Sequence, residues 1–249
     1  MKIVVCGKGG SGKSTVTSLL AKEIASRGGK VLVIDADESN YGLHQQLGME
    51  LPKTFIDYFG GKMKVLQMLS NGPQNMPALF DRPWNLSDIP KEYVTEKDGI
   101  MLMSPGKIET ANEACACPFN AIMCQFVPAL ALNKNEFVIM DMEAGIEHFG
   151  RGTDNVADAV VMVIDPSYES LKLSSKVTEI AKGIGKPVYY VLNKVTDESL
   201  PVMESKIPDA SKIACVLKND GDILSAGLIG EPLSAGRPEI GKLASVLGA

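Results

Sequence analysis

The sequence has no apolar run that approaches the roughly 20 residues of a membrane span, and it has no excess of positive charge. Its net charge of −5 argues against a surface built to hold a nucleic-acid backbone. The first apolar segment leads straight into a glycine-rich loop, which is not the arrangement of a signal peptide. These features predict a cytoplasmic protein that binds neither membrane nor nucleic acid.

Repeats and low-complexity tracts are absent from the sequence, and cysteine is sparse. The five cysteines are an odd number without a secretory signal, so we expect core residues or metal ligands in a reducing compartment rather than disulfides. The 249 residues are 45% hydrophobic and 22% charged, which is ordinary globular composition. We therefore expect one α/β domain spanning residues 1–249.

A glycine-rich stretch near the start fits G-x-x-x-x-G-K-[ST], the phosphate-binding loop pattern. It comprises Gly7, Lys8, Gly9, Gly10, Ser11, Gly12, Lys13 and Ser14, with Thr15 directly after it. The apolar run 2–6 predicts a strand before the loop, and apolar positions 16, 19, 20 and 24 predict a helix after it. Backbone N–H groups and the helix N-terminus would then surround nucleotide phosphates. The pattern predicts that Lys13 reaches the β and γ phosphates and that the Ser14 hydroxyl ligates magnesium.

Acidic residues come at the ends of two predicted buried strands. Asp35 and Asp37 follow the apolar run 30–34, and Asp141 ends the run 137–140. Ligands of doubly wound sheets bind at the carboxyl ends of strands, so we expect these carboxylates beside the loop, where they serve magnesium and position water. Asp141 is predicted to hold magnesium, and Gly145 to offer a backbone N–H to the γ-phosphate. A capping role for Asp35 and Asp37 is an open alternative.

The pair Cys115-Ala116-Cys117-Pro118 stands just before a helix predicted from 118 to 132, which Pro128 is expected to kink or end early. A helix N-terminus lowers the pKa of a thiol, and the thiolate is the form that binds metal. Two thiols are half of the about four ligands that Zn²⁺ or a similar soft ion takes. Two such pairs facing each other across a dimer axis would complete the set. A chance pair in a loop and a redox dithiol are the alternatives.

The rest of the chain alternates apolar runs with helical patterns. Strands are predicted at 99–104, 159–165, 187–192 and 212–217, and helices at 55–69, 168–184 and 238–247. The apolar runs are continuous, as in parallel strands buried on both faces. We expect a doubly wound, mostly parallel sheet with helices on both faces. Cys6 and Cys215 are expected in its core, and Cys124 is interpreted as a small buried residue or a third thiol near the pair.

Lys8 gives the loop the form K-G-G-x-G-K-S, which resembles the deviant Walker A motif of the MinD, ParA and nitrogenase iron-protein class of dimeric P-loop ATPases. The resemblance implies a homodimer that closes on ATP, in which Lys8 reaches the nucleotide of the partner subunit. It also implies that Asp37 aligns the attacking water and that Asn193 reads the adenine edge. A solvated loop charge is the alternative for Lys8.

The pattern C-x-C-P, together with the run D-M-E-A-G-I-E-H from position 141, resembles the CooC family of nickel-inserting ATPases that help mature carbon monoxide dehydrogenase. This resemblance implies nickel or zinc held by Cys115 and Cys117 at a dimer interface, and a nickel-enzyme client. A maturation ATPase for acetyl-CoA synthase, a MinD/ParA-like positioning ATPase and an iron–sulfur reductase are the alternatives. The C-terminal residues lack the basic amphipathic helix expected of a membrane tether.

Overall fold

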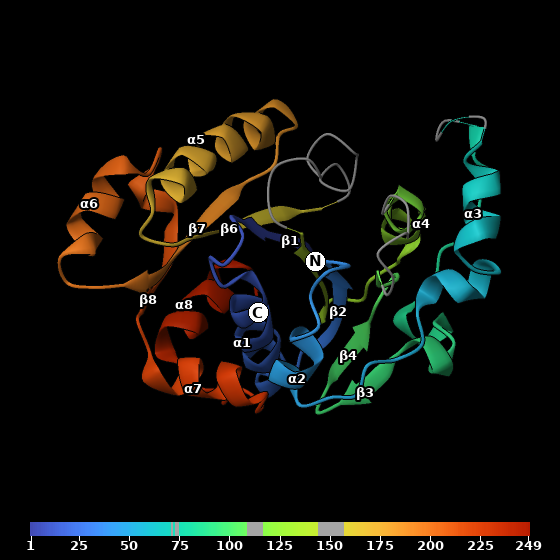
Figure 1. Ribbon diagram of the computed structural model, residues 1–249, viewed down its shortest axis with the longest axis horizontal. Helices are drawn as coiled ribbons and strands as arrows, with labels where there is room; N and C mark the ends of the chain where they lie inside the picture. Colours follow the sequence, from blue (N-terminus) through green and yellow to red (C-terminus); the bar gives the residue numbers. More distant parts are fainter. Residues whose placement is uncertain (71, 73–74, 109–116, 144–156) are drawn as a thin grey trace.

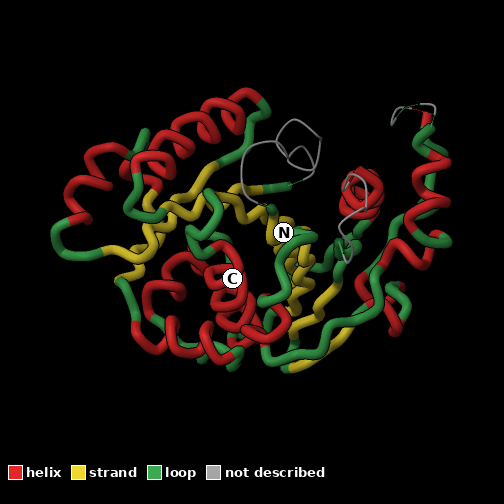
Figure 2. The backbone as a smooth tube through the Cα atoms, in the orientation of Figure 1, coloured by secondary structure: helices red, strands yellow, loops and turns green. Residues whose placement is uncertain are grey.

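A mostly parallel sheet runs through the middle of the computed structural model, which describes residues 1–70, 72, 75–108, 117–143 and 157–249 (Figures 1 and 2). The described strands are β1 Lys2–Gly7, β2 Lys30–Ala36, β3 Thr95–Lys97, β4 Ile100–Met103, β5 Glu136–Met142, β6 Ala159–Ile164, β7 Val188–Val195 and β8 Ile213–Lys218. They lie in the order β3-β4-β2-β5-β1-β6-β7-β8. Each neighbouring pair is parallel except β3 with β4. The predicted doubly wound sheet is confirmed, and β1 lies near its centre.

Helices cover both faces of this sheet: α5 and α6 lie on one side of β6 and β7, and α1 and α8 lie on the other (Figure 1). The described α-helices are α1 Lys13–Ser26, α2 Leu43–Leu47, α3 Lys62–Met68, α4 Cys117–Ala129, α5 Tyr168–Gly183, α6 Ser199–Lys206, α7 Gly221–Ile229 and α8 Pro238–Val246. Short 3-10 helices are η1 Phe55–Phe59, η3 Leu86–Asp88, η4 Lys91–Tyr93 and η7 Ala210–Lys212. Within the ranges described above, no helix has the length and apolar character needed to cross a membrane.

The sheet divides the hydrophobic core into two clusters, because successive side chains of a strand point to opposite faces. Val4 and Leu32 belong to the cluster that includes the apolar side chains of α4 and α5. Ile3 and Val31 belong to the cluster that includes those of α1 and α8. Strands buried on both faces explain why the apolar runs in the sequence are continuous rather than alternating.

The prediction of a single helix at 55–69 is wrong. The chain forms η1 and then α3, and Gly60 and Gly61 separate them with φ values of 89° and 86°. Positive φ interrupts a right-handed helix, and glycine adopts it without the steric cost of a side chain. The helix predicted at 118–132 ends at Ala129, directly after Pro128, so the expected early end is confirmed. The short antiparallel strand β3 was not predicted.

Aromatic rings pack over α4 on one face of the sheet. Phe55 lies 4.9 Å from Phe126 and 6.4 Å from Trp84 between ring centroids, and Phe80 lies 5.1 Å from Trp84. Phe126 is fully buried, and Trp84 is 8% exposed. This packing fixes α4, whose first residue is Cys117, against an aromatic cover formed by Phe55, Phe80 and Trp84.

Candidate active site

The loop between β1 and α1 needs glycine at two of its predicted positions. Gly7 has a φ of 153° and Gly12 a φ of 96°. A Cβ built on Gly7 would lie 2.4 Å from the carbonyl oxygen of Val163, and one built on Gly12 would lie 2.2 Å from Nδ2 of Asn193. Gly9 and Gly10 are exposed at the outer turn of the same loop. The loop therefore passes so close to β6 and β7 that only a backbone without side chains fits at its two ends.

Two buried polar groups point to an anion inside this loop. Lys13 is 7% exposed, and the carbonyl oxygen of Lys8 lies 3.5 Å from its Nζ. Ser11 Oγ is buried and, in the described part of the chain, has no hydrogen-bond partner. The Lys13 ammonium has a carbonyl oxygen at the long distance of 3.5 Å and the charge of Asp141 nearby, which leaves room for a further anion, and a buried hydroxyl needs a partner. The phosphates of a nucleotide would supply both, so the residues present fit the predicted ligand.

Oxygen atoms gather at the first turn of α1. Ser14 Oγ donates to Asp141 Oδ2 at 2.6 Å, and Thr17 Oγ1 donates to Asp141 Oδ1 at 3.2 Å. Asn40 Nδ2 donates to Ser14 Oγ at 2.7 Å. Burial raises the pKa of Asp141 to about 6, although the hydrogen bond from Ser14 and the charge of Lys13 lower it. Hydroxyl and carboxylate oxygens are the ligands that Mg²⁺ prefers, so Ser14 and Asp141 fit the predicted magnesium site.

The two aspartates after β2 have different surroundings. Asp35 is fully buried next to Asp141 in the sheet register, and its Oδ2 accepts a hydrogen bond from Lys107 Nζ at 2.7 Å. Burial raises the pKa of Asp35 to about 7, while Lys107 lowers it. Asp37 is half-buried, and its Oδ1 accepts hydrogen bonds from the backbone N–H and the hydroxyl of Ser39 at 3.1 and 2.6 Å. Asp37 thus closes a turn and does not cap a helix, because the N-cap of α2 is Gly42. Its role toward water stays a prediction.

The outer side of the loop carries three further polar residues. Lys8 is half-buried, and its Nζ lies 3.8 Å from Glu169 Oε2 at the start of α5. Asn193 is 6% exposed, and its Nδ2 donates to the carbonyl oxygen of Ser11 at 2.8 Å. Lys194 Nζ donates to the carbonyl oxygen of Gly10 at 2.8 Å. Asn193 therefore supports the loop directly, and adenine recognition by its side chain stays a prediction.

The cysteine motif is described only in part. Cys117 is the first residue of α4, is exposed and is disulfide-bonded, so the expectation that the cysteines form no disulfide is wrong for Cys117. Pro118 follows in the first turn as expected. Cys115 and Gly145 lie outside the described residues. Among the residues that are described, no group of three or more His, Cys, Asp or Glu side chains is arranged to hold a metal ion.

The other cysteines are separate from this motif. Cys6 and Cys215 are buried as predicted, and burial raises the pKa of each thiol to about 12. Cys124 is half-buried on α4. A thiol with so high a pKa is inert at neutral pH, so Cys6 and Cys215 are structural residues.

Thr17, Asn40, Lys107 and Lys194 contact the site but were not predicted. Thr17 had a detectable signal, because it lies three residues after Ser14 on the same face of a predicted helix. Lys194 had a weaker one, since it follows Asn193 directly at the end of a predicted strand. Asn40 and Lys107 lie in irregular segments whose contacts depend on how the chain folds back, and no pattern in the sequence indicates them.

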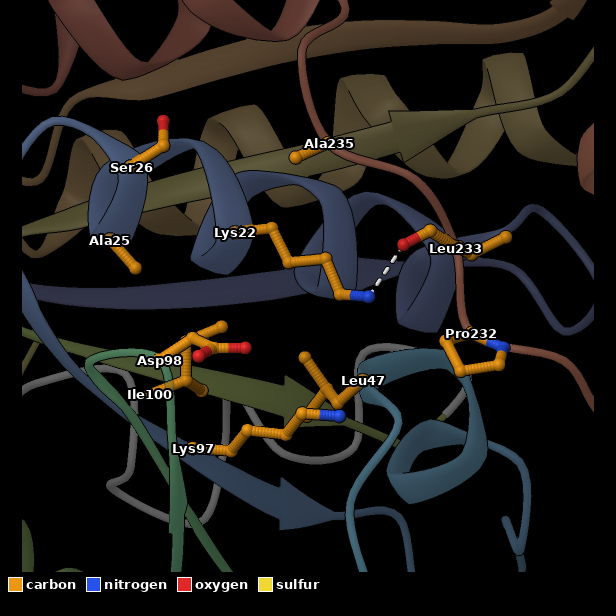
Figure 3. A pocket seen from close by; sticks show the side chains of 10 residues that line it. All are labelled: Lys22, Ala25, Ser26, Leu47, Lys97, Asp98, Ile100, Pro232, Leu233 and Ala235. Carbon is orange, nitrogen blue, oxygen red and sulfur yellow. Dashed lines mark hydrogen bonds between the residues drawn. The ribbon is translucent and has the colours of Figure 1, made fainter.

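A groove of about 340 Å³ lies away from the loop, between α1, α2 and the segment 232–235 (Figure 3). Lys22 Nζ donates to the carbonyl oxygen of Leu233 at 2.5 Å across its edge. Lys97 Nζ donates to the carbonyl oxygen of Gly48 at 2.9 Å. Both lysines therefore fasten loops to the body of the protein, and this groove has no part in the candidate active site.

Comparisons with known proteins agree with this geometry. The sequence matches the CbiA family, described as the CobQ/CobB/MinD/ParA nucleotide binding domain, over residues 2–214. It is 46% identical to an uncharacterized ATP-binding protein of Methanocaldococcus jannaschii over 99% of both chains. It is 34% identical to the carbon monoxide dehydrogenase accessory protein CooC of Rhodospirillum rubrum, over 78% of this chain and 74% of that protein.

Solved structures show the same fold at low sequence identity. The septum site-determining protein MinD of Pyrococcus horikoshii, complexed with Mg-ADP, is 18% identical and has a TM-score of 0.68, covering 99% of this chain and 95% of that chain. MinD of Aquifex aeolicus is 20% identical and has a TM-score of 0.67 over 99% and 95% of the two chains. At these identities the likeness concerns the fold alone.

Proposed function

Because this chain belongs to the CobQ/CobB/MinD/ParA family and is an ATPase that uses ATP and magnesium, we propose that it is a metallochaperone in which ATP hydrolysis controls a nickel site. The observation that carries the proposal is the exposed Cys117 at the first residue of α4, two positions after Cys115. The relative named as a carbon monoxide dehydrogenase accessory protein supports this choice of cargo. Zinc is the other soft cation that such thiolates hold.

Hydrolysis in this proposal depends on residues around the loop. Lys13, the N–H groups of the loop and the backbone N–H of Gly145 hold the phosphates, with Ser11 Oγ as a further partner. Magnesium, when bound by Ser14 and Asp141, supplies positive charge that offsets the charge of the phosphate oxygens. Asp37 releases Ser39 and aligns the attacking water. Thr15 completes the first turn of α1, and Asn193 reads the adenine base.

The metal site in this proposal is shared by two copies of the chain. Once the disulfide of Cys117 is reduced, Cys115 and Cys117 supply two thiolates, and the same pair of a second copy completes a set of about four ligands. Lys8 of each copy reaches the nucleotide of the other, so ATP binding closes the dimer. Nickel must then bind the two dimer states with different affinity, since no coupling exists without such a difference. Residues 1–249 act as one domain, in the cytoplasm and without membrane or nucleic acid.

The coupling is tested by measuring nickel affinity with ADP and with a non-hydrolysable ATP analogue, under reducing conditions. A difference of about tenfold or more is expected, which is within the usual range of allosteric coupling. If the nickel affinity is equal in the two nucleotide states, ATP does not control nickel binding and this part of the proposal is wrong.

The site itself is tested by native mass spectrometry of the nickel-loaded protein beside Cys115→Ala, Cys117→Ala and the control Cys215→Ala. One metal per dimer, lost in the first two variants and kept in the control, supports the shared thiolate site. A nucleotide-dependent dimer without metal would instead favour a positioning ATPase of the MinD kind. Metal-free carbon monoxide dehydrogenase and metal-free acetyl-CoA synthase, each incubated with nickel-loaded protein and ATP, distinguish the two possible clients.

A further inference from the structure

Lys107 is a buried cation in the segment that follows β4. Its side chain is 1% exposed, and its Nζ donates to three oxygens: Asp35 Oδ2 at 2.7 Å, the carbonyl oxygen of Asp37 at 2.7 Å and the carbonyl oxygen of Asn40 at 2.5 Å. A lysine ammonium has three donors, so all of them are used. The side chain therefore holds both ends of the turn formed by residues 37–40.

This turn connects Lys107 with the candidate active site. Asp37, the residue expected to align water, begins the 37–40 turn, and Asn40 ends it. Asn40 Nδ2 donates to Ser14 Oγ at 2.7 Å, and Ser14 Oγ donates to Asp141 Oδ2 at 2.6 Å. Lys107 thus fixes the backbone of Asp37 and of Asn40, and Asn40 contacts Ser14, a predicted magnesium ligand. Lys107 lies 67 positions away from Asn40 in the sequence.

The segment that carries Lys107 is fastened to the same turn at a second point. The backbone N–H of Ile108 donates to the carbonyl oxygen of Glu38 at 3.2 Å. The hydroxyl of Tyr41 donates to the carbonyl oxygen of Ile108 at 2.8 Å, and the ring of Tyr41 lies 5.7 Å from Lys107 Nζ. These bonds bind residues 107–108 to residues 37–41 as one unit, so a shift of the turn shifts the segment with it.

The other side of this segment packs against the helix that begins with Cys117. A Cβ built on Gly106 would lie 2.1 Å from Cε1 of Phe119, so the backbone of Gly106 touches the ring directly. Phe119 is 6% exposed and lies in the first turn of α4. The contact gives a continuous path of packed and hydrogen-bonded groups from Asp37 through Lys107 and Gly106 to α4.

We propose that Lys107 is a positioning residue: it sets the 37–40 turn for hydrolysis and transmits movement of that turn through Gly106 and Phe119 to the start of α4. The transmission to the cysteines rests on the proposed function, whereas the effect on hydrolysis does not. An ordered turn matters because misplacing an aligned reactant by about 1 Å costs on the order of a hundredfold in rate.

Removing Lys107 alone would leave Asp35 buried without a counter-charge, which destabilises a fold strongly. Asp35→Asn alone in turn leaves the Lys107 ammonium buried without its carboxylate, so both variants are first checked for folding by circular dichroism. The test then compares Lys107→Met/Asp35→Asn with Asp35→Asn, which keeps the two bonds from Lys107 to the carbonyl oxygens. We expect the double variant to have a kcat about tenfold or more below that of Asp35→Asn, with KM for ATP changed about threefold at most. A kcat equal to that of Asp35→Asn would overturn the positioning role.

Two further variants keep this test decisive. Lys107→Arg retains the charge beside Asp35, but its planar head cannot direct three donors to the same three oxygens. Once circular dichroism shows that this variant is folded, its kcat is expected to be about tenfold below that of the wild type. Lys22→Met removes a lysine that also holds a backbone carbonyl, that of Leu233, outside the site, and its kcat is expected to equal that of the wild type. Wild-type kcat in Lys107→Arg would contradict the proposal.

The transmission is tested by hydrogen–deuterium exchange of the α4 peptide with ADP and with a non-hydrolysable ATP analogue, without nickel. The wild type is expected to show a different exchange rate in the two states. Gly106→Ala, whose new methyl group displaces Phe119, is expected to lose that difference while keeping kcat within about threefold. Identical α4 exchange in the two states of the wild type would overturn the transmission. Failure of nickel binding alone would overturn the proposed function and leave both results of this test standing.

Discussion

At the scale of single residues, the buried carboxyl of Asp141, the proposed magnesium ligand, lowers the stability of the fold at neutral pH. Its pKa rises from 3.8 to about 6 in the fold, so the native state holds the proton more tightly than the unfolded chain. The free energy of unfolding therefore falls as pH rises from about 4 to 6, and the loss is complete above that range.

Asp141→Asn removes this buried charge. We expect it to abolish magnesium-dependent ATP hydrolysis and to raise the free energy of unfolding of the nucleotide-free protein by about 1–3 kcal/mol at pH 7.5. The gain should shrink toward pH 4, where the wild-type carboxyl is protonated. Urea denaturation at the two pH values, with a hydrolysis assay, measures both effects. Asp197→Asn, on the surface, should leave hydrolysis unchanged, and a destabilised Asp141→Asn at pH 7.5 would contradict the argument.

Gly12 and Gly185 form a matched pair, because both have positive φ, 96° and 69°. Gly185 faces open space, whereas a Cβ on Gly12 would lie 2.2 Å from Asn193 Nδ2. Gly185→Ala should cost only the backbone strain, about 1–2 kcal/mol of unfolding free energy. Gly12→Ala should cost more and lower ATP affinity about tenfold or more, because the loop must shift away from Asn193. Urea denaturation measures the unfolding free energies and ATP titration measures the affinities. Equal losses of stability and of ATP affinity in the two variants would show that the contact between Gly12 and Asn193 is unimportant.

How far the site could be predicted depends on where its contacts come from. The loop glycines, Lys13, Ser14 and Asp141 follow from motifs whose spacing places them at the ends of adjacent strands. Lys107 belongs to no motif, since its partners Asp35 and Asn40 meet it only because an irregular segment folds back over β2. The sequence also could not show that Asn193 donates to the loop carbonyl of Ser11, because that bond depends on how closely β7 approaches the loop.

At the scale of secondary structure, elements with continuous apolar runs, the short β4 included, were predictable, whereas the polar edge strand β3 and the glycine-interrupted segment 55–68 were not. β1, β2, β5 and β6 are buried on both faces, so each is a run of apolar residues. β3 consists of Thr95, Glu96 and Lys97, which are half-buried or exposed at the edge of the sheet. The cover at 55–68 has helical spacing, but Gly60 and Gly61 divide it, and spacing alone cannot show a positive φ.

The helix α4 should depend on the aromatic cover more than on any contact with the sheet edge. Phe126 is fully buried between Phe55, Phe80 and Trp84, so Phe126→Ala is expected to lower the free energy of unfolding by about 3–5 kcal/mol. Leu224→Ala on α7 is the control, because Leu224 is 62% exposed and should cost about 0.5 kcal/mol or less. Urea denaturation of both variants measures the difference, and similar losses would contradict the packing argument.

At the scale of the whole molecule, the proposed dimer makes Lys8 the residue to test. In this structure its ammonium lies 3.8 Å from the exposed Glu169 carboxylate. An exposed ion pair of this kind contributes about 0–1 kcal/mol, so Lys8 is free to leave it. With a non-hydrolysable ATP analogue we expect a dimer mass by light scattering for the wild type and for Glu169→Gln, and a monomer mass for Lys8→Ala. A dimer of Lys8→Ala would assign Lys8 to the solvated-charge alternative.

The burial of Lys107 also determines how this side chain reacts with reagents that acylate amines. Such reagents need an accessible nitrogen, and Lys107 does not offer one, because its Nζ is buried and hydrogen-bonded to three oxygens. Surface lysines such as Lys53 and Lys218 stand in water and are open to attack. Acylation of Lys107 can therefore occur only while its hydrogen bonds to residues 37–40 are broken and its side chain is exposed. The rate at which Lys107 is acylated, measured on the peptide that contains it after proteolysis, would therefore report how often this turn opens.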